Sequence, residues 1–79
     1  MKLQRVSDRQ WEVDSRTEPG ILRLTLRGRI SVKDMTAFVT AHNAAIDGYQ
    51  GADYKVLCDL RELSPLSPEC AELLGRAKA

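Results

Sequence analysis

Residues 21–28 read Ile-Leu-Arg-Leu-Thr-Leu-Arg-Gly, with a leucine at every second position and a polar residue between leucines. Successive side chains of a β-strand point to opposite faces of the sheet. Leu22, Leu24 and Leu26 would therefore share one face, while the arginines and the threonine share the other. The stretch predicts a half-buried strand over residues 21–28, and the rest of the fold is built around it.

A shorter strand is expected before this one. Gln10–Asp14 places Trp11 and Val13 on one face, and residues 15–20 are polar and end in Pro-Gly, a strong turn signal. The two strands should therefore pair in antiparallel fashion. Residues 1–9 carry little pattern, and we expect them to form an N-terminal arm or a frayed edge.

A helix is predicted after the leucine-rich strand. Ser31 is suited to the N-cap position, with Asp34 three residues later as in a capping box. Apolar or aromatic side chains and one histidine then recur at spacings of three and four: Met35, Phe38, Val39, His42, Ala45, Ile46 and Tyr49. The spacing predicts a helix from about Val32 to Asp47 that stops at Gly48.

A second strand and a second helix should follow. Residues 54–60, Tyr-Lys-Val-Leu-Cys-Asp-Leu, are apolar enough for a central strand. Two Ser-Pro pairs then mark a loop, where Ser67 is suited to an N-cap and Pro68 to the first helical turn. We expect this helix to run to about Lys78, with four residues facing inward: Cys70, Ala71, Leu74 and Ala77.

The element order predicts an α/β fold of the form β-β-α-β-α. Strand, helix and strand in succession imply a parallel pair joined by a right-handed crossover, so the mixed sheet should carry its helices on one face. Such a sheet leaves Val56, Leu57 and Cys58 poorly covered. Either another chain completes the sheet, or these residues are part of a longer protein and the fold is incomplete at its C-terminus. We expect the second.

The length, net charge and apolar content of the chain exclude several classes of protein. The 79 residues form one domain at most, and 12 basic against 11 acidic side chains give a net charge of +1, unlike a nucleic-acid binder. No apolar run matches a signal peptide or a membrane span, so we expect a cytoplasmic protein. Cys58 and Cys70 are then expected to be free, buried thiols, with a disulfide as the alternative.

Two segments resemble a known family. Residues 24–31, Leu-Thr-Leu-Arg-Gly-Arg-Ile-Ser, look like the strand that leads into the first helix of STAS domains, the SpoIIAA-like anti-sigma-factor antagonists. Residues 56–63, Val-Leu-Cys-Asp-Leu-Arg-Glu-Leu, look like their central strand, which ends in Asp-Leu. The resemblance covers residues 10–79, about the N-terminal two thirds of such a domain.

The resemblance implies a non-catalytic module that binds a regulatory, kinase-like or scaffold protein through the N-terminus of its second helix. In that family the helix begins near Asp-Ser-Ser/Thr-Gly and carries a phosphorylated residue. The matching segment here has Glu69 in the slot of that residue and Ser67 in the slot of the preceding Asp. The residues expected to bind or regulate a partner are Ser31, Asp59, Ser64, Ser67 and Glu69.

Catalytic and metal sites are not expected. His42 is the only histidine, and Ser64 and Ser67 lack the glycine elbow and neighbouring base of a serine nucleophile. The two cysteines do not suffice for zinc, and no cofactor is implied. Ser67 is interpreted as a helix cap, with a regulatory phosphorylation site as the alternative.

Three further alternatives stay open. Arg23, Arg27 and Arg29 form a basic row that is either a solvated strand face or a contact for an acidic partner or phospholipid headgroups. The chain could instead be a SpoIIAA-like domain that binds a lipid or small ligand. The incomplete sheet also allows a structural piece that assembles with itself.

Overall fold

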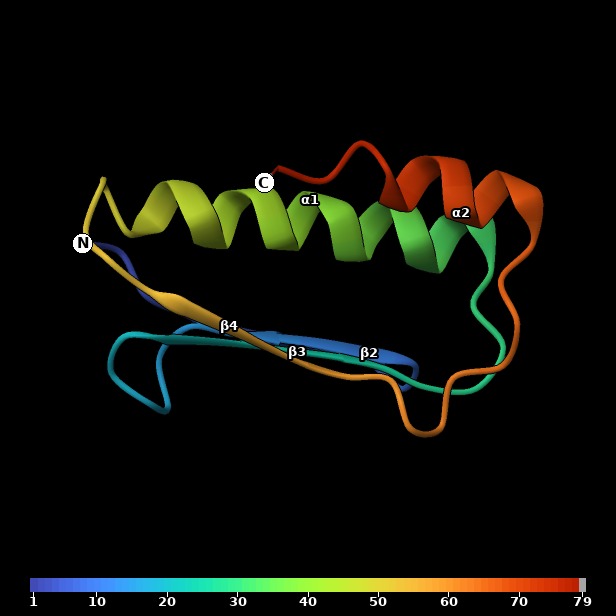
Figure 1. Cartoon of the computed structure of the whole chain (residues 1–79), viewed down its shortest axis with the longest axis horizontal. Coiled ribbons are helices and arrows are strands. Elements are labelled where there is room, and N and C mark those ends of the chain that lie inside the picture. The colour runs from blue at the N-terminus through green and yellow to red at the C-terminus, as the bar shows by residue number, and fades with distance from the viewer. Residues whose placement is uncertain (79) are drawn as a thin grey trace.

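The computed structural model describes residues 1–78 as a mixed sheet with both helices on one side (Figure 1). The elements along the chain are β1 (Arg5–Ser7), β2 (Trp11–Asp14), β3 (Ile21–Leu26), α1 (Val32–Gly48), β4 (Lys55–Asp59) and α2 (Pro68–Leu74). The sheet order is β1-β2-β3-β4, with β3 and β4 parallel and the other neighbours antiparallel. The predicted α/β class and the crossover through α1 are confirmed.

The alternation in β3 has the predicted consequence. Leu22, Leu24 and Leu26 are buried, whereas Arg23 on the other face is exposed. The leucines lie in register with β2, where Leu26 is opposite Trp11. Further apolar side chains complete the core from α1, its flanks and α2: Ile30, Met35, Phe38, Ala45, Tyr49 and Cys70.

Within residues 1–9, where an arm or a frayed edge is expected, the chain forms the edge strand β1. Residues 5–7 pair antiparallel with β2, and Val6 lies opposite Val13. Three residues are too few for an alternating pattern to be read in the sequence. The strand forms because the free edge of β2 offers backbone partners, a long-range effect.

The prediction that residues 54–60 form a central strand is also wrong, because β4 is an edge strand. Val56 is 53% exposed and Leu57 is 49% exposed, so the expected poor cover of these residues is confirmed. Cys58 is likewise exposed, contrary to the predicted buried thiol, whereas Cys70 is buried; both are free. No element among residues 1–78 pairs with the outer edge of β4.

Helix α1 starts as predicted but ends one residue later. Gly48 is its last residue rather than its stop signal, and Tyr49 occupies the C-cap with ordinary helical dihedrals. The glycine is needed for a different reason. The Lys2 N–H donates to the Gly48 carbonyl at 2.8 Å, and a Cβ at position 48 would lie 2.2 Å from the Lys2 carbonyl oxygen. Gly48 thus permits the N-terminal segment to dock on the helix.

Helix α2 is shorter than predicted. It ends at Leu74, with Gly75 as C-cap, and Ala71 is exposed instead of facing inward. Cys70 is buried as expected, and Leu73 and Leu74 pack against the core. Neither helix within residues 1–78 has the length and apolarity that a membrane crossing requires.

The docking of Lys2 predicts that Gly48→Ala destabilises the protein. Alanine is about 1 kcal/mol better than glycine inside a helix, but its Cβ would collide with a backbone oxygen, and overpacking costs about 1–3 kcal/mol. We expect a net loss of about 1 kcal/mol in urea unfolding. The control is Ala44→Gly, a substitution at an exposed position of α1 that reports helix propensity alone. Stabilisation by Gly48→Ala would refute the contact.

Asp14 predicts a pH dependence of stability. Burial raises its pKa, but hydrogen bonds from Thr17 and Arg16 outweigh this and hold the pKa below 3.8. Its Oδ1 accepts the N–H groups of Arg16 at 2.9 Å and Thr17 at 3.0 Å. A carboxylate with a lowered folded pKa stabilises the fold above the unfolded pKa, and that stability is lost as pH falls through the folded value.

We therefore expect Asp14→Asn to cost about 1–2 kcal/mol at neutral pH and progressively less below pH 3.8. Urea unfolding across this pH range measures the gap between variant and native protein. Asp53→Asn, which removes the same charge from an exposed loop, is the control. A gap that stays constant with pH would contradict the assignment.

Candidate functional site

A groove lies where the connections into the two helices meet. It has a volume of about 610 Å³ and is lined from two distant segments, residues 29–31 and residues 64–67. In Figure 1 these connections run side by side at the end of the sheet where β3 and β4 finish. Parallel strands end at the same edge, so the crossover topology brings the two loops together.

Gly28 fastens one loop to the other. Its N–H donates to the Glu62 carbonyl at 2.8 Å, and its own carbonyl accepts the Ser64 N–H at 3.0 Å. These bonds extend the parallel pairing as an isolated bridge between Gly28 and Leu63. Gly28 has a φ of 66°, and a Cβ there would lie 2.5 Å from the Gln10 Oε1 atom. The position therefore favours glycine both in conformation and in space.

The predicted helix caps line this groove. Ser31 Oγ accepts the Asp34 N–H at 3.0 Å, and Ser67 Oγ accepts the Cys70 N–H at 3.2 Å, which confirms both N-caps. The buried Cys70 Sγ donates to the Ile30 carbonyl at 3.4 Å and ties α2 to the first loop. Each hydroxyl satisfies a backbone donor that the helix leaves unpaired.

Three of the five predicted partner-binding residues come together here, namely Ser31, Ser64 and Ser67. Glu69 is exposed in the first turn of α2. It follows the groove residue Ser67 by two positions but does not itself line the groove. A carboxylate there is favoured by the positive end of the helix dipole. The groove is thus lined by the three predicted serines, but not by the two predicted carboxylates, Asp59 and Glu69.

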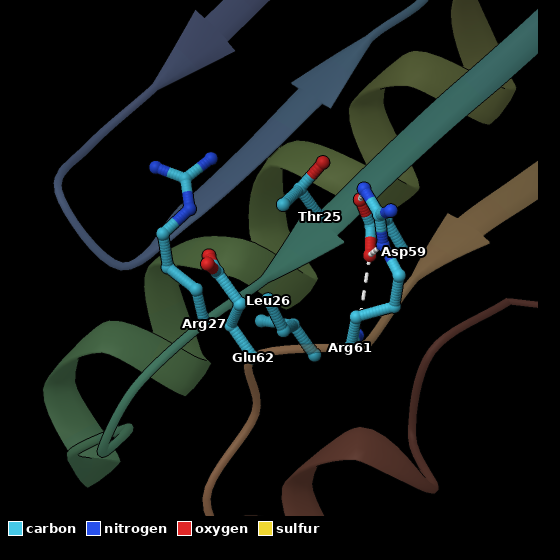
Figure 2. Close-up of a pocket in the computed structure, with 6 residues that line it drawn as sticks. All are labelled: Thr25, Leu26, Arg27, Asp59, Arg61 and Glu62. Carbon is cyan, nitrogen blue, oxygen red and sulfur yellow. Dashed lines mark hydrogen bonds and ion pairs between the residues drawn. The ribbon is translucent and has the colours of Figure 1, made fainter.

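Asp59 is engaged elsewhere. Its carboxylate accepts the Arg61 backbone N–H and Nε at 3.1 Å each and the Arg61 terminal guanidinium nitrogen at 2.9 Å. Figure 2 shows this pair folded together at the end of β4. The hydrogen bonds lower the pKa of Asp59 to about 2, so it stays ionised at neutral pH. Its side chain stabilises the turn after β4 rather than a helix N-terminus.

The expected contact surface included the segment from Ser64 to Cys70, but it did not include Arg29 and Ile30, which also line the groove. The sequence predicts a basic row of Arg23, Arg27 and Arg29 along the strand, but β3 ends at Leu26 and the chain turns at Gly28 before Arg29. Arg23 lies in β3 and Arg27 directly follows it, and their local partners are Glu18 and the Arg9 carbonyl respectively. The glycine in Arg-Gly-Arg was the signal that could have separated them.

His42 does not line the groove. His42 lies buried within α1, where its ring faces Phe38 and its Nδ1 lies 3.1 Å from the Asn43 side-chain oxygen. It is therefore not placed as a base for the groove serines. Within residues 1–78, no cluster of three His, Cys, Asp or Glu side chains could hold a metal ion.

The role of Gly28 predicts that Gly28→Ala disturbs the groove. A left-handed alanine costs about 1–2 kcal/mol, and Gln10 must also move. We expect a loss of that size in urea unfolding, together with amide NMR shifts at Leu63 and Ser64. Gly20→Ala is the matched control, because Gly20 has a φ of 75° but open space around it. Equal shifts at Leu63 in both variants would contradict this account.

Comparison of the chain with protein-family models, with curated proteins and with solved structures finds no match. The resemblance to STAS domains therefore stays a prediction carried by residues 24–31 and 56–63. The structure itself shows a four-stranded mixed sheet with two helices.

Proposed function

We propose that this chain is a non-catalytic protein-interaction module that binds a regulatory or scaffold protein through the groove between residues 29–31 and 64–67. The single observation that carries the proposal is the bridged pair of loops at Gly28. Because two backbone hydrogen bonds hold the loops together, little of their freedom remains to be lost on binding.

The lining suits a protein partner. Pro65 and Leu66 supply apolar surface, and three serines and Arg29 supply hydrogen-bonding groups. Protein interfaces typically combine an apolar centre with a polar rim, and arginine is enriched in them. Arg29 is exposed, and no ion pair engages it among residues 1–78. We therefore expect the partner to present an acidic or hydroxyl-rich segment.

The STAS resemblance supports the same surface from a different direction. It implies that a partner contacts the N-terminus of the second helix, and Ser64 and Ser67 lie directly before that helix. The resemblance and the groove geometry are independent, since the first uses sequence patterns and the second uses loop positions.

Site-specific photocrosslinking tests the proposal. A benzophenone amino acid in place of Pro65, an exposed groove residue, should yield a discrete protein adduct in native lysate. The same amino acid in place of Arg16, which is exposed in the loop at the opposite end of β3, is the control and should not give this adduct.

A second variant makes the test specific. Arg29→Glu reverses the exposed charge in the groove and should reduce the Pro65 adduct at least tenfold if the partner is acidic. Arg16→Glu makes the same charge change outside the groove and should leave the adduct in place. The proposal fails if Pro65 and Arg16 capture the same proteins, or if the groove position captures none.

A further inference from the structure

The two edges of the sheet differ in how well they are protected. β1 is three residues long, and its two exposed residues are Arg5 and Ser7. β4 is five residues long and exposes Val56, Leu57 and Cys58 in its middle. Natural proteins usually blunt an edge with central charges, proline, a bulge or short length. The centre of β4 has none of these features.

Backbone groups along the outer side of β4 are ready for pairing. The Lys55 N–H donates inward, to the Gly20 carbonyl at 2.8 Å. Consecutive residues of a strand direct their N–H and C=O groups to opposite sides, so Leu57 also faces β3. Val56 and Cys58 consequently direct their N–H and C=O groups away from the sheet, as two donors and two acceptors.

The charges of β4 are complementary to those of a second β4 strand that runs in the opposite direction. It reads Lys-Val-Leu-Cys-Asp, with a cation at the start, a carboxylate at the end and apolar residues between. The register with β3 places Lys55, Leu57 and Asp59 on the open face of the sheet and Val56 and Cys58 on the helix face. Lys55 makes no ion pair among residues 1–78.

We propose that β4 pairs antiparallel with β4 of a second copy of this chain, about a two-fold axis at Leu57. Lys55 then lies opposite Asp59 of the second copy, and Asp59 lies opposite its Lys55. Leu57 meets Leu57 of the second copy at the axis. In a parallel arrangement with the same register, each charged residue would meet its own kind, which disfavours that pairing.

The backbone supports this register. With the axis at Leu57, Val56 and Cys58 of the second copy form a hydrogen-bonded pair, and both residues point their backbone groups outward. Leu57 becomes a non-hydrogen-bonded pair, in which opposing side chains are closest. Such an interface closes on itself after two copies, so it yields a dimer and not a fibre.

Asp59 can serve both its present partner and the new one. Arg61 donates two hydrogen bonds to Oδ1 and one to Oδ2, whereas a carboxylate has about four acceptor positions. A position on Oδ2 is thus available to Lys55 of the second copy. The proposed dimer uses β4 and leaves the groove at residues 29–31 and 64–67 out of its pairing, so the two proposals can fail separately.

Sedimentation velocity of the whole chain tests the pairing first. β4 is only five residues long, and small interfaces associate weakly, so the mass should rise from monomer to dimer between about 10 µM and about 1 mM. A mass that stays monomeric throughout overturns the proposal. That result is also the one expected if a further segment of chain or an unrelated protein is the true occupant of this edge.

Charge reversal tests the register. Lys55→Glu and Asp59→Lys each place like charges opposite one another at both symmetric pairs, and each should weaken the dimer about tenfold or more. An equimolar mixture of the two variants restores an opposite-charge pair at both positions, so it should dimerise again. Lys33→Glu, an equal change on the exposed surface of α1, is the control. A dimer indifferent to both reversals overturns the proposal.

A cysteine at the axis gives an independent readout. Leu57→Cys brings two thiols together in a non-hydrogen-bonded pair, whose Cα separation of about 4.5 Å suits a disulfide. Mild oxidation should yield a covalent dimer from this variant. The native chain, whose Cys58 lies opposite Val56, should cross-link at least tenfold less. Equal cross-linking of the two proteins would contradict the register.

Discussion

Burial of the leucine row of β3 in the core between the sheet and the helices is the interaction on which the rest of the structure depends. Leu22, Leu24 and Leu26 are almost fully covered, and each buried leucine side chain contributes about 1.5–3 kcal/mol through the hydrophobic effect. Met35 and Phe38 of α1 belong to the same buried cluster, and Trp11 of β2 packs edge-on against Phe38 at a ring separation of 6.1 Å. In a domain of this size, few other contacts can supply comparable stability.

This burial determines where the groove and the open edge of the sheet lie. Because α1 carries the chain back across the sheet, β4 runs parallel to β3, and the loops that leave both strands meet at one edge. The groove is a consequence of that meeting, and Gly28 makes it rigid. The same topology leaves β4 as the last strand, with half of its apolar surface uncovered.

The surface ion pairs contribute little to stability. The pairs Arg5–Glu12, Arg23–Glu18 and Lys78–Asp47 lie at least partly in solvent, where ion pairs contribute about 0–1 kcal/mol. Arg29 and Lys55, in contrast, have no such partner among residues 1–78. These two cations belong to the two surfaces proposed for binding, where an incoming carboxylate would be their natural counterpart.

Features that depend on neighbouring residues could be predicted from the sequence by itself. The alternation of β3, the start of α1 at Ser31, the cap at Ser67 and the parallel crossover all follow from local periodicity and capping. Only the tertiary structure decided that β4 lies at an edge, that residues 5–7 form a strand and that Ser31, Ser64 and Ser67 share a groove. These outcomes depend on which distant segments supply backbone partners, and no short window of sequence contains that information.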